Sequence, residues 1–136
     1  MIGDKNIGKA GEDQAVSFLE KRGYKVLARN FHREHNGVRL AEIDIVAQEN
    51  RSAMDRFLGR PATMVFVEVK AASSPEAEFS PEVRVNSAKR GKIARLAEAW
   101  LVARGVPLES PWRIDVISVV NPQGGPNCQF EHFQNV

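Results

Sequence analysis

The sequence predicts an α/β fold in which a mixed sheet of four to five strands is flanked by helices. Two segments have the spacing of amphipathic helices, and apolar runs predict three strands between them and one or two strands after them. The order helix, three strands, helix, two strands is typical of a central sheet with helices packed on it. No internal repeat or change of composition divides the chain, so residues 1–136 are expected to form a single domain.

Composition excludes several classes of protein. The chain has 19 basic and 17 acidic side chains, and its net charge of +2 identifies no partner by itself. Cys128 is the only cysteine, which excludes an internal disulfide or a cysteine zinc cluster and suits a reducing compartment. No apolar run reaches the ~20 residues of a membrane span, and the first residues lack the apolar centre of a signal peptide. We therefore expect a cytoplasmic protein that does not contact a membrane.

Both helices are predicted from apolar side chains at helical spacing. The first spans residues 9–22, and Gly23 follows where a helix commonly ends. The second spans residues 87–105 and has a basic outer face. The apolar stripes comprise Ala15, Val16 and Leu19 in the first helix, and Ile93, Leu96, Ala97, Trp100 and Leu101 in the second.

The strands are predicted from extended apolar runs and the turns between them. Asn36-Gly37 separates two such runs, and Asn-Gly in this position is the strongest short signal for a hairpin. Residues 50–61 are expected to form a loop with one helical turn, and the serines and prolines of residues 72–86 predict a connection. The predicted strands are residues 24–34, 38–48, 62–71, 112–120 and a short one near 128–133.

Charged side chains interrupt two of these strands. Along residues 64–70, the apolar side chains on one face give way to Glu68 and Lys70, as expected where a strand leaves the core and reaches a cleft. The preceding strand repeats the pattern. It is expected to place Glu42 and Asp44 on one face and Ile43 and Ile45 on the other.

Each helix is also expected to direct one charged side chain toward the sheet. Glu12 and Lys89 lie on the apolar stripes of their helices, and a carboxylate there is costly unless it is paired, solvated or bound to metal. If the charged groups converge, Glu12, Asp44 and Glu68 form a carboxylate cluster suited to Mg²⁺ or Mn²⁺. Lys70 would then serve the nucleophile or the transition state of phosphodiester hydrolysis.

Each of these side chains also has a purely structural interpretation. About one acid-x-lysine match is expected by chance in such a chain, so Glu68 and Lys70 alone could form a cross-strand ion pair. Glu12 could be an acid that the helix dipole favours, and Lys89 a solvated cap residue. The remaining polar residues are expected to be structural: Glu42 paired with Arg39, Asp115 paired with Arg113, and His32, His35 and His132 on the surface or in the core.

Longer motifs resemble a known family. The segments "GKAGEDQAVSFLEKRGYKVLARNF", "AEIDIVA", "MVFVEVK", "SAKRGKIARLAEAWL" and "WRIDVISV" are similar to the YraN-like family of bacterial proteins, over nearly the whole chain. The order of a helix acid, "EID" and "VFVEVK" resembles the PD-(D/E)xK superfamily. That resemblance implies a restriction-endonuclease-like three-layer fold. Relation to archaeal Holliday junction resolvases implies a magnesium-dependent endonuclease that acts on DNA, branched DNA included, as a homodimer.

The resemblance also implies roles for single residues. Asp44 matches the metal-binding aspartate of the superfamily, and Glu68 and Lys70 match its acid and its catalytic lysine. Glu12 matches the helix acid of the resolvase branch, which completes a site for Mg²⁺ or Mn²⁺. Residues expected to support the ligands without binding metal are Glu42 and Lys89. Candidate contacts to DNA phosphates are Arg84, Lys89, Arg90, Lys92 and Arg95.

Two main hypotheses of function follow. The first is structure-selective hydrolysis of DNA, because no segment resembles a helix that reads bases. The alternative is a non-catalytic module that binds nucleic acid or a protein partner, because a fold does not fix a function. A third is an interaction protein that uses Phe57 and Leu58 as exposed anchors. The roles of residues 50–61 and 72–86 stay open.

Overall fold

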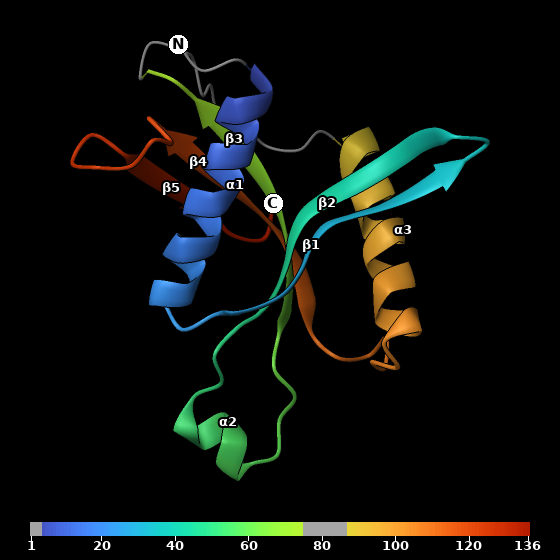
Figure 1. The fold of residues 1–136 in the computed structure, drawn as a ribbon. Helices are drawn as coiled ribbons and strands as arrows, with labels where there is room; N and C mark the ends of the chain where they lie inside the picture. The colour runs from blue at the N-terminus through green and yellow to red at the C-terminus, as the bar shows by residue number, and fades with distance from the viewer. Residues whose placement is uncertain (1–3, 75–86) are drawn as a thin grey trace.

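The computed structural model describes residues 4–74 and 87–136, which form a five-stranded sheet between two helices (Figure 1). Helix α1 (Asp4–Lys21) packs on one face of the sheet and helix α3 (Ser87–Ala103) on the other. The predicted mixed sheet with flanking helices is confirmed. None of the helices in the described residues is long and apolar enough to cross a membrane.

The elements follow the predicted pattern, with one larger difference at the start of the first helix. Helix α1 begins at Asp4, whereas the sequence predicted a start at residue 9. The prediction missed the first turns because they lack the apolar stripe that marks the rest of the helix. The helical turn predicted within 50–61 is helix α2 (Ala53–Phe57), where the Ser52 hydroxyl accepts the backbone N–H of Asp55. The strands are β1 (Lys25–His35), β2 (Val38–Gln48), β3 (Met64–Ala72), β4 (Trp112–Val120) and β5 (Gln129–Phe133).

The strands lie in the order β1-β2-β3-β4-β5. All neighbours are antiparallel except β3 and β4, which are parallel and joined through α3, since parallel strands require a crossover. The hairpin between β1 and β2 closes at Asn36-Gly37, and both residues have positive φ, as a two-residue hairpin turn requires. The predicted hairpin is therefore present.

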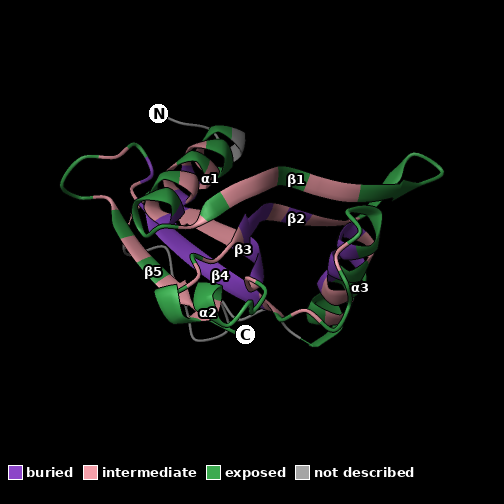
Figure 2. Ribbon diagram, turned by 90° about the horizontal axis from the view of Figure 1, so that it is seen from below, coloured by how far each residue is buried: buried purple, intermediate pink, exposed green. Residues whose placement is uncertain are grey.

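Two hydrophobic cores lie on opposite faces of the sheet. On one face, Leu19 of α1 packs against Val65 and Val67 of β3. On the other, Trp100 of α3 packs edge-on against Phe66, with ring centroids 5.9 Å apart. Each large apolar side chain buried in this way contributes about 1.5–3 kcal/mol relative to exposure. Figure 2 shows that burial is concentrated in β3 and β4, whereas the tip of the hairpin and α2 are exposed.

The simple alternation predicted for β2 is wrong at one point. Ile43 packs in the core beneath α3 and Ile45 in the core beneath α1, so the two isoleucines lie on opposite faces. The pairing of β1 with β2 skips Asn30 and Asp44 at this place, and Asn30 has a φ of 54°. A local change in strand direction of this kind turns the hairpin away from the rest of the sheet, which Figure 1 shows.

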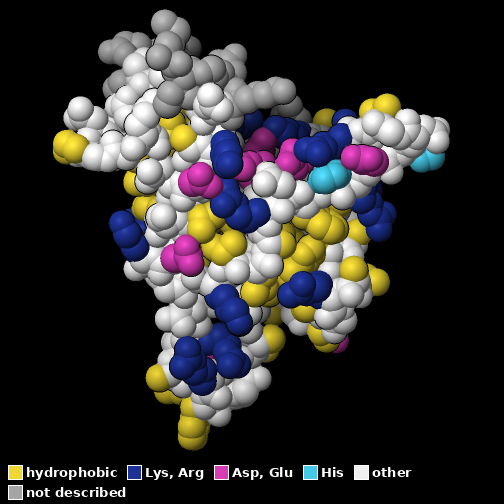
Figure 3. Space-filling view, viewed as in Figure 1, with side chains coloured by type: hydrophobic (Ala, Val, Ile, Leu, Met, Phe, Trp, Pro, Cys, Tyr) yellow, Lys and Arg dark blue, Asp and Glu magenta, His cyan; other side chains and the backbone are white. Residues whose placement is uncertain are grey.

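Helix α2 forms a separate protrusion. Figure 3 shows it at the bottom of the molecule, with basic side chains at its base and hydrophobic ones at its tip. Phe57 is 84% exposed and Leu58 is 50% exposed, as the interaction hypothesis requires. Arg56 and Arg60 already hydrogen-bond within the protrusion.

Candidate active site

The candidate site lies where strands β2 and β3 separate. Their pairing ends at Ile45 and Val67, and the next residues on the two strands are Asp44 and Glu68. Strand β3 continues alone beside β4 beyond this point. The Asp44 carboxylate accepts a hydrogen bond of 2.8 Å from the backbone N–H of Val69, so a side chain spans the gap. The split opens the middle of the sheet to polar groups.

Glu68 is the most buried acid at this opening, with a side chain 11% exposed. Its Oε1 atom accepts from the ammonium groups of Lys70, at 3.2 Å, and of Lys89. Its Oε2 atom is buried and has no hydrogen-bond partner among the described residues. A buried carboxylate oxygen without a donor is unfavourable by about 1–3 kcal/mol or more. The ion pair between Glu68 and Lys70 that the structural interpretation expected is therefore present, but it lies along one strand rather than across two, and the second partner of Glu68 comes from α3.

Lys89 lies in direct contact with Glu68. Burial opposes the charged form of its ammonium group, but the hydrogen bond to Glu68 outweighs this and raises the pKa of Lys89. The lysine is therefore a fixed positive charge at the carboxylate. Lys89 was predicted to support the ligands without binding metal, and a contact with Glu68 is the position that such a role requires.

Glu12 and Asp44 bring further negative charge to the opening. The two carboxyls lie within hydrogen-bonding reach, and burial raises the pKa of both. The pKa of Asp44 reaches about 7, although the Val69 N–H acts in the opposite direction. The negative charges of Glu12, Glu68 and Glu42 contribute to that rise. The carboxylates are close enough to repel one another, which is the electrostatic condition that a bound cation relieves.

Close packing of α1 against β3 places Glu12 at the site. A Cβ atom added to Gly11 would lie 2.5 Å from the Cβ of Ala71, which is too close for any real pair of carbon atoms. The absence of a side chain at Gly11 thus lets the helix approach the strand. Glu12, the next residue, is half-buried beside the sheet as a result.

Two residues that sequence analysis missed also belong to the site. The amide of Asn30, turned so that its NH₂ group faces the acids, donates to Glu12 and to Glu42 at 3.1 Å. Arg29 is paired with Asp13 at 2.7 Å and lies 3.9 Å from Glu12. The available signal was an asparagine in the middle of a strand, where it is disfavoured unless the backbone adopts a positive φ.

Figure 3 shows the charged side chains of this region together. Acidic and basic groups alternate in a band across the upper part of the face, at the level where the hairpin leaves the body. Arg39 and Glu42 form an ion pair of 3.2 Å, as predicted. The site is therefore a mixed cluster in which acids outnumber the lysines that reach them.

Comparison with known proteins identifies the family of the chain. The family described as "Uncharacterised protein family UPF0102" matches residues 11–119. The chain belongs to the UPF0102 family. A UPF0102 protein from Geobacter metallireducens is 37% identical over 132 residues, which cover 97% of this chain and 92% of the relative. One from Roseiflexus castenholzii is 35% identical over 127 residues, which cover 93% of this chain and 89% of the relative. The resemblance to the YraN-like family is thereby confirmed.

The acids of this UPF0102 protein fit a hard divalent cation by their chemistry. Carboxylate oxygens are the ligands that Mg²⁺ and Mn²⁺ prefer, and the unpartnered Oε2 atom of Glu68 is available for one. Within residues 4–74 and 87–136, however, no group of three acidic, histidine or cysteine side chains is arranged so that it could hold a metal ion. Here the ammonium groups of Lys70 and Lys89 supply the positive charge that Glu68 faces.

The residues predicted to contact DNA differ in whether they are free to bind a ligand in this UPF0102 chain. Lys92 and Arg95 are exposed on α3. Arg90 donates from Nε to the backbone oxygen of Val136 at 2.8 Å, so it is engaged within the protein. Arg84 lies outside the described residues. Lys92 and Arg95 are thus the predicted contacts that the structure leaves available.

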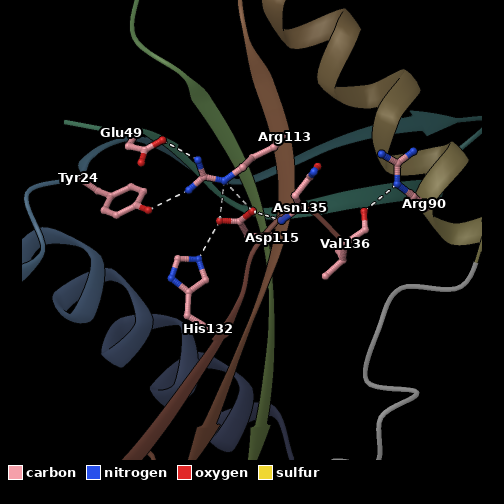
Figure 4. Close-up of polar contacts among 8 residues, drawn as sticks. All are labelled: Tyr24, Glu49, Arg90, Arg113, Asp115, His132, Asn135 and Val136. Carbon is pink, nitrogen blue, oxygen red and sulfur yellow. Dashed lines mark hydrogen bonds and ion pairs between the residues drawn. The ribbon is translucent and has the colours of Figure 1, made fainter. Parts of the chain in front are cut away.

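A second charged cluster lies around Asp115 on the α1 side of the sheet (Figure 4). Arg113 donates to Asp115 at 3.0 Å, as the predicted structural pair requires, and His132 lies 2.8 Å from it. Burial raises the pKa of Asp115, but the hydrogen bonds from His132, Asn135 and Arg113 outweigh it and lower the pKa. Both oxygens of this fully buried acid accept hydrogen bonds, so the cluster is a structural anchor of this chain.

Proposed function

We propose that this protein is a divalent-metal-dependent endonuclease that hydrolyses phosphodiester bonds of DNA. One observation carries the proposal: Glu12 of α1 and Asp44 of β2 lie within hydrogen-bonding reach of each other at the split in the sheet, where β3 carries Glu68 and Lys70. Carboxylates that hold a divalent metal ion, with an adjacent lysine, are suited to phosphodiester hydrolysis. A restriction-endonuclease-like fold and membership of the PD-(D/E)xK superfamily are parts of this proposal.

The chain's own residues divide the work in this proposal. Asp44 and Glu68 would hold Mg²⁺ or Mn²⁺, with Glu12 as a third ligand, directly or through water. Such an ion lowers the pKa of bound water and stabilises negative charge on a phosphate. Lys70, whose side chain is 38% exposed beside Glu68, would orient the nucleophile or contact the scissile phosphate. Lys89 would hold Glu68 in place.

DNA is the proposed partner, and selection by its structure is the proposed specificity. Exposed basic residues on α3 bind phosphates, and phosphate contacts carry no sequence information. Branched DNA, a homodimer and a cytoplasmic location belong to the same proposal. Two active sites related by a two-fold axis would suit a symmetric junction.

The test combines metal binding with cleavage. We expect the wild type to bind Mn²⁺ saturably in calorimetric titrations and to cut linear, flap or four-way DNA only with the metal. Asp44→Asn should lose the metal, and Glu68→Gln or Lys70→Ala should reduce cleavage by at least about 100-fold, the contribution typical of such groups. Glu20→Gln, an exposed acid on α1, is the control. Full activity in Glu68→Gln or Lys70→Ala would contradict the assignment.

A specific observation favours a second candidate, a non-catalytic nucleic-acid-binding module. Glu68 is engaged by two lysines, and the described acids do not stand ready as a metal site. This candidate predicts DNA binding that weakens steeply with salt, needs no divalent ion and produces no cleavage. The same titration and cleavage assays therefore separate the two functions.

A further inference from the structure

We propose that the groove between the β1–β2 hairpin and α3 holds one unpaired DNA strand and leads it to Glu68. The proposal rests on the proposed function for the position of the scissile bond, and it goes further by naming the conformation of the substrate. Figures 1 and 2 both show the hairpin extended alongside α3. We call the depression between them the hairpin groove.

The hairpin groove consists of two adjoining cavities. The outer cavity, of about 350 Å³, lies between Arg33 and Leu40 of the hairpin and Arg95 of α3. The inner cavity, of about 370 Å³, reaches Glu42 and Lys89. The two cavities share three lining residues, which are Leu40, Ala41 and Lys92. Lys89 lines the inner cavity and contacts Glu68, so the inner end of the groove adjoins the candidate active site.

Three cations along the groove are available to a ligand. Arg33, Lys92 and Arg95 are exposed, and the structure pairs none of them with an acid among the described residues. By contrast, the neighbouring Arg29 and Arg39 are committed to Asp13 and Glu42. Cations that line a groove without acidic partners are complementary to a row of phosphates.

The groove also has an apolar wall that a duplex could not use. Leu40 is 57% exposed, and Ala41 and Leu96 line the same depression. In a duplex the faces of the bases are stacked on one another, so only sugars and phosphates would meet this wall. An unpaired strand can lay the face of a base against it while its phosphates contact the cations.

The volume of the groove favours a single strand as well. Each cavity is near the lower end of the ~300–1,000 Å³ seen in sites that enclose one small organic molecule. Such a space holds a nucleotide or two of one strand. A duplex would rest across the rim and leave both cavities empty.

The test measures binding in EDTA, so that the metal-dependent chemistry is absent. A labelled 12-nucleotide strand and the corresponding duplex are titrated with the full chain. We expect the strand to bind at least about fivefold more tightly than the duplex, with a salt slope near −2 for three phosphates. Arg33→Glu and Lys92→Glu should each weaken strand binding at least about fivefold. Leu40→Ser should weaken strand binding about threefold and leave duplex binding unchanged.

The matched control is Lys25→Glu, which makes the same charge change on the same strand, β1, but lies outside the groove. We expect it to change strand binding by less than about twofold. Equal affinity for strand and duplex, or equal losses in Lys25→Glu and the groove variants, would overturn the groove assignment.

Cleavage assays with Mn²⁺ separate this proposal from the nuclease proposal. Strand binding with the expected variant pattern, but no cleavage of any substrate, would support the groove and reject the nuclease. Metal-dependent cleavage that is equally fast on unpaired and fully paired DNA would reject the groove and keep the nuclease.

Discussion

The Asp44 carboxylate accepts the backbone N–H of Val69 at 2.8 Å, beyond the last paired residues of β2 and β3. A charged side chain thus joins two strands at the point where their backbones separate. The hydrogen bond spans the split and holds Asp44 beside Glu12 and Glu68. Asp44 therefore links the stability of the fold to the negative charge at the site.

The first prediction concerns how far the negative charge of Asp44 destabilises the folded protein. Its pKa is about 7 in the folded protein and 3.8 ordinarily, so the folded state holds the proton more tightly than the unfolded state. The stability that this group contributes is present below pH 4 and is lost as the pH rises toward 7. In EDTA at pH 8, Asp44→Asn should therefore be more stable than the wild type by about 1–3 kcal/mol. Urea unfolding at pH 5 and pH 8 measures the difference.

The neutral side chain of Asn retains an oxygen that can accept the Val69 N–H, so the change removes charge and little else. Glu20→Gln removes an exposed acid on α1, away from the site, and should leave the stability within about 0.5 kcal/mol of wild type. A variant Asp44→Asn that is less stable than wild type at pH 8 would contradict the argument.

The second prediction concerns Lys89 and the affinity of the site for metal. Its ammonium group touches Glu68, so it repels any cation that the acid would bind. Lys89→Met should raise the affinity for Mn²⁺ by about three- to tenfold, because a partly exposed charge a few ångströms away acts with this strength. Calorimetric titration with Mn²⁺ at pH 7 provides the measurement. Lys92→Met removes a charge from the same helix without touching Glu68, and an equal effect in both variants would reject a specific role for Lys89.

The third prediction concerns the approach of α1 to β3. Gly11→Val places atoms where the Ala71 side chain already lies, so the helix must move away. We expect a loss of about 1–3 kcal/mol in the free energy of unfolding, as for other overpacked sites. Gly8→Ala lies in the same helix with no atom within 4 Å of the added Cβ, and should stabilise the protein by about 0.4–1 kcal/mol. Urea unfolding of both variants tests the contrast, and equal effects would contradict close packing at Gly11.

The sequence predicted those parts of the fold that local patterns determine. The predicted boundaries of β2 and β4 agree with the structure, because alternating apolar residues and adjacent turns mark both strands. The start of α1 was missed because its first turns carry no apolar stripe. The positions of Ile43 and Ile45 were wrong because a strict alternation assumes an undistorted strand, and Asn30 distorts the neighbouring one.

In the candidate site, too, the features set by local sequence patterns were predicted and those set by tertiary packing were not. The face on which Glu68 and Lys70 lie follows from strand geometry, and the inward direction of Glu12 follows from helical spacing. The direct contact of Lys89 with Glu68 and the bridging amide of Asn30 depend on how distant segments pack. Neither spacing nor composition contains that information.

The last prediction concerns the buried anchor around Asp115. Asp115→Asn removes the charge that Arg113 and His132 face, while the guanidinium stays buried. Because the pKa of Asp115 is lowered in the folded protein, its contribution is present above its ordinary pKa of 3.8 and is lost as the pH falls through the lowered value. We expect a loss of about 3–5 kcal/mol at pH 7, as for other broken buried pairs, and a smaller loss near pH 3. Urea unfolding at both pH values tests this. Glu131→Gln, an exposed neighbour on β5, is the control, and a loss below about 1 kcal/mol at pH 7 would show that the cluster is no anchor.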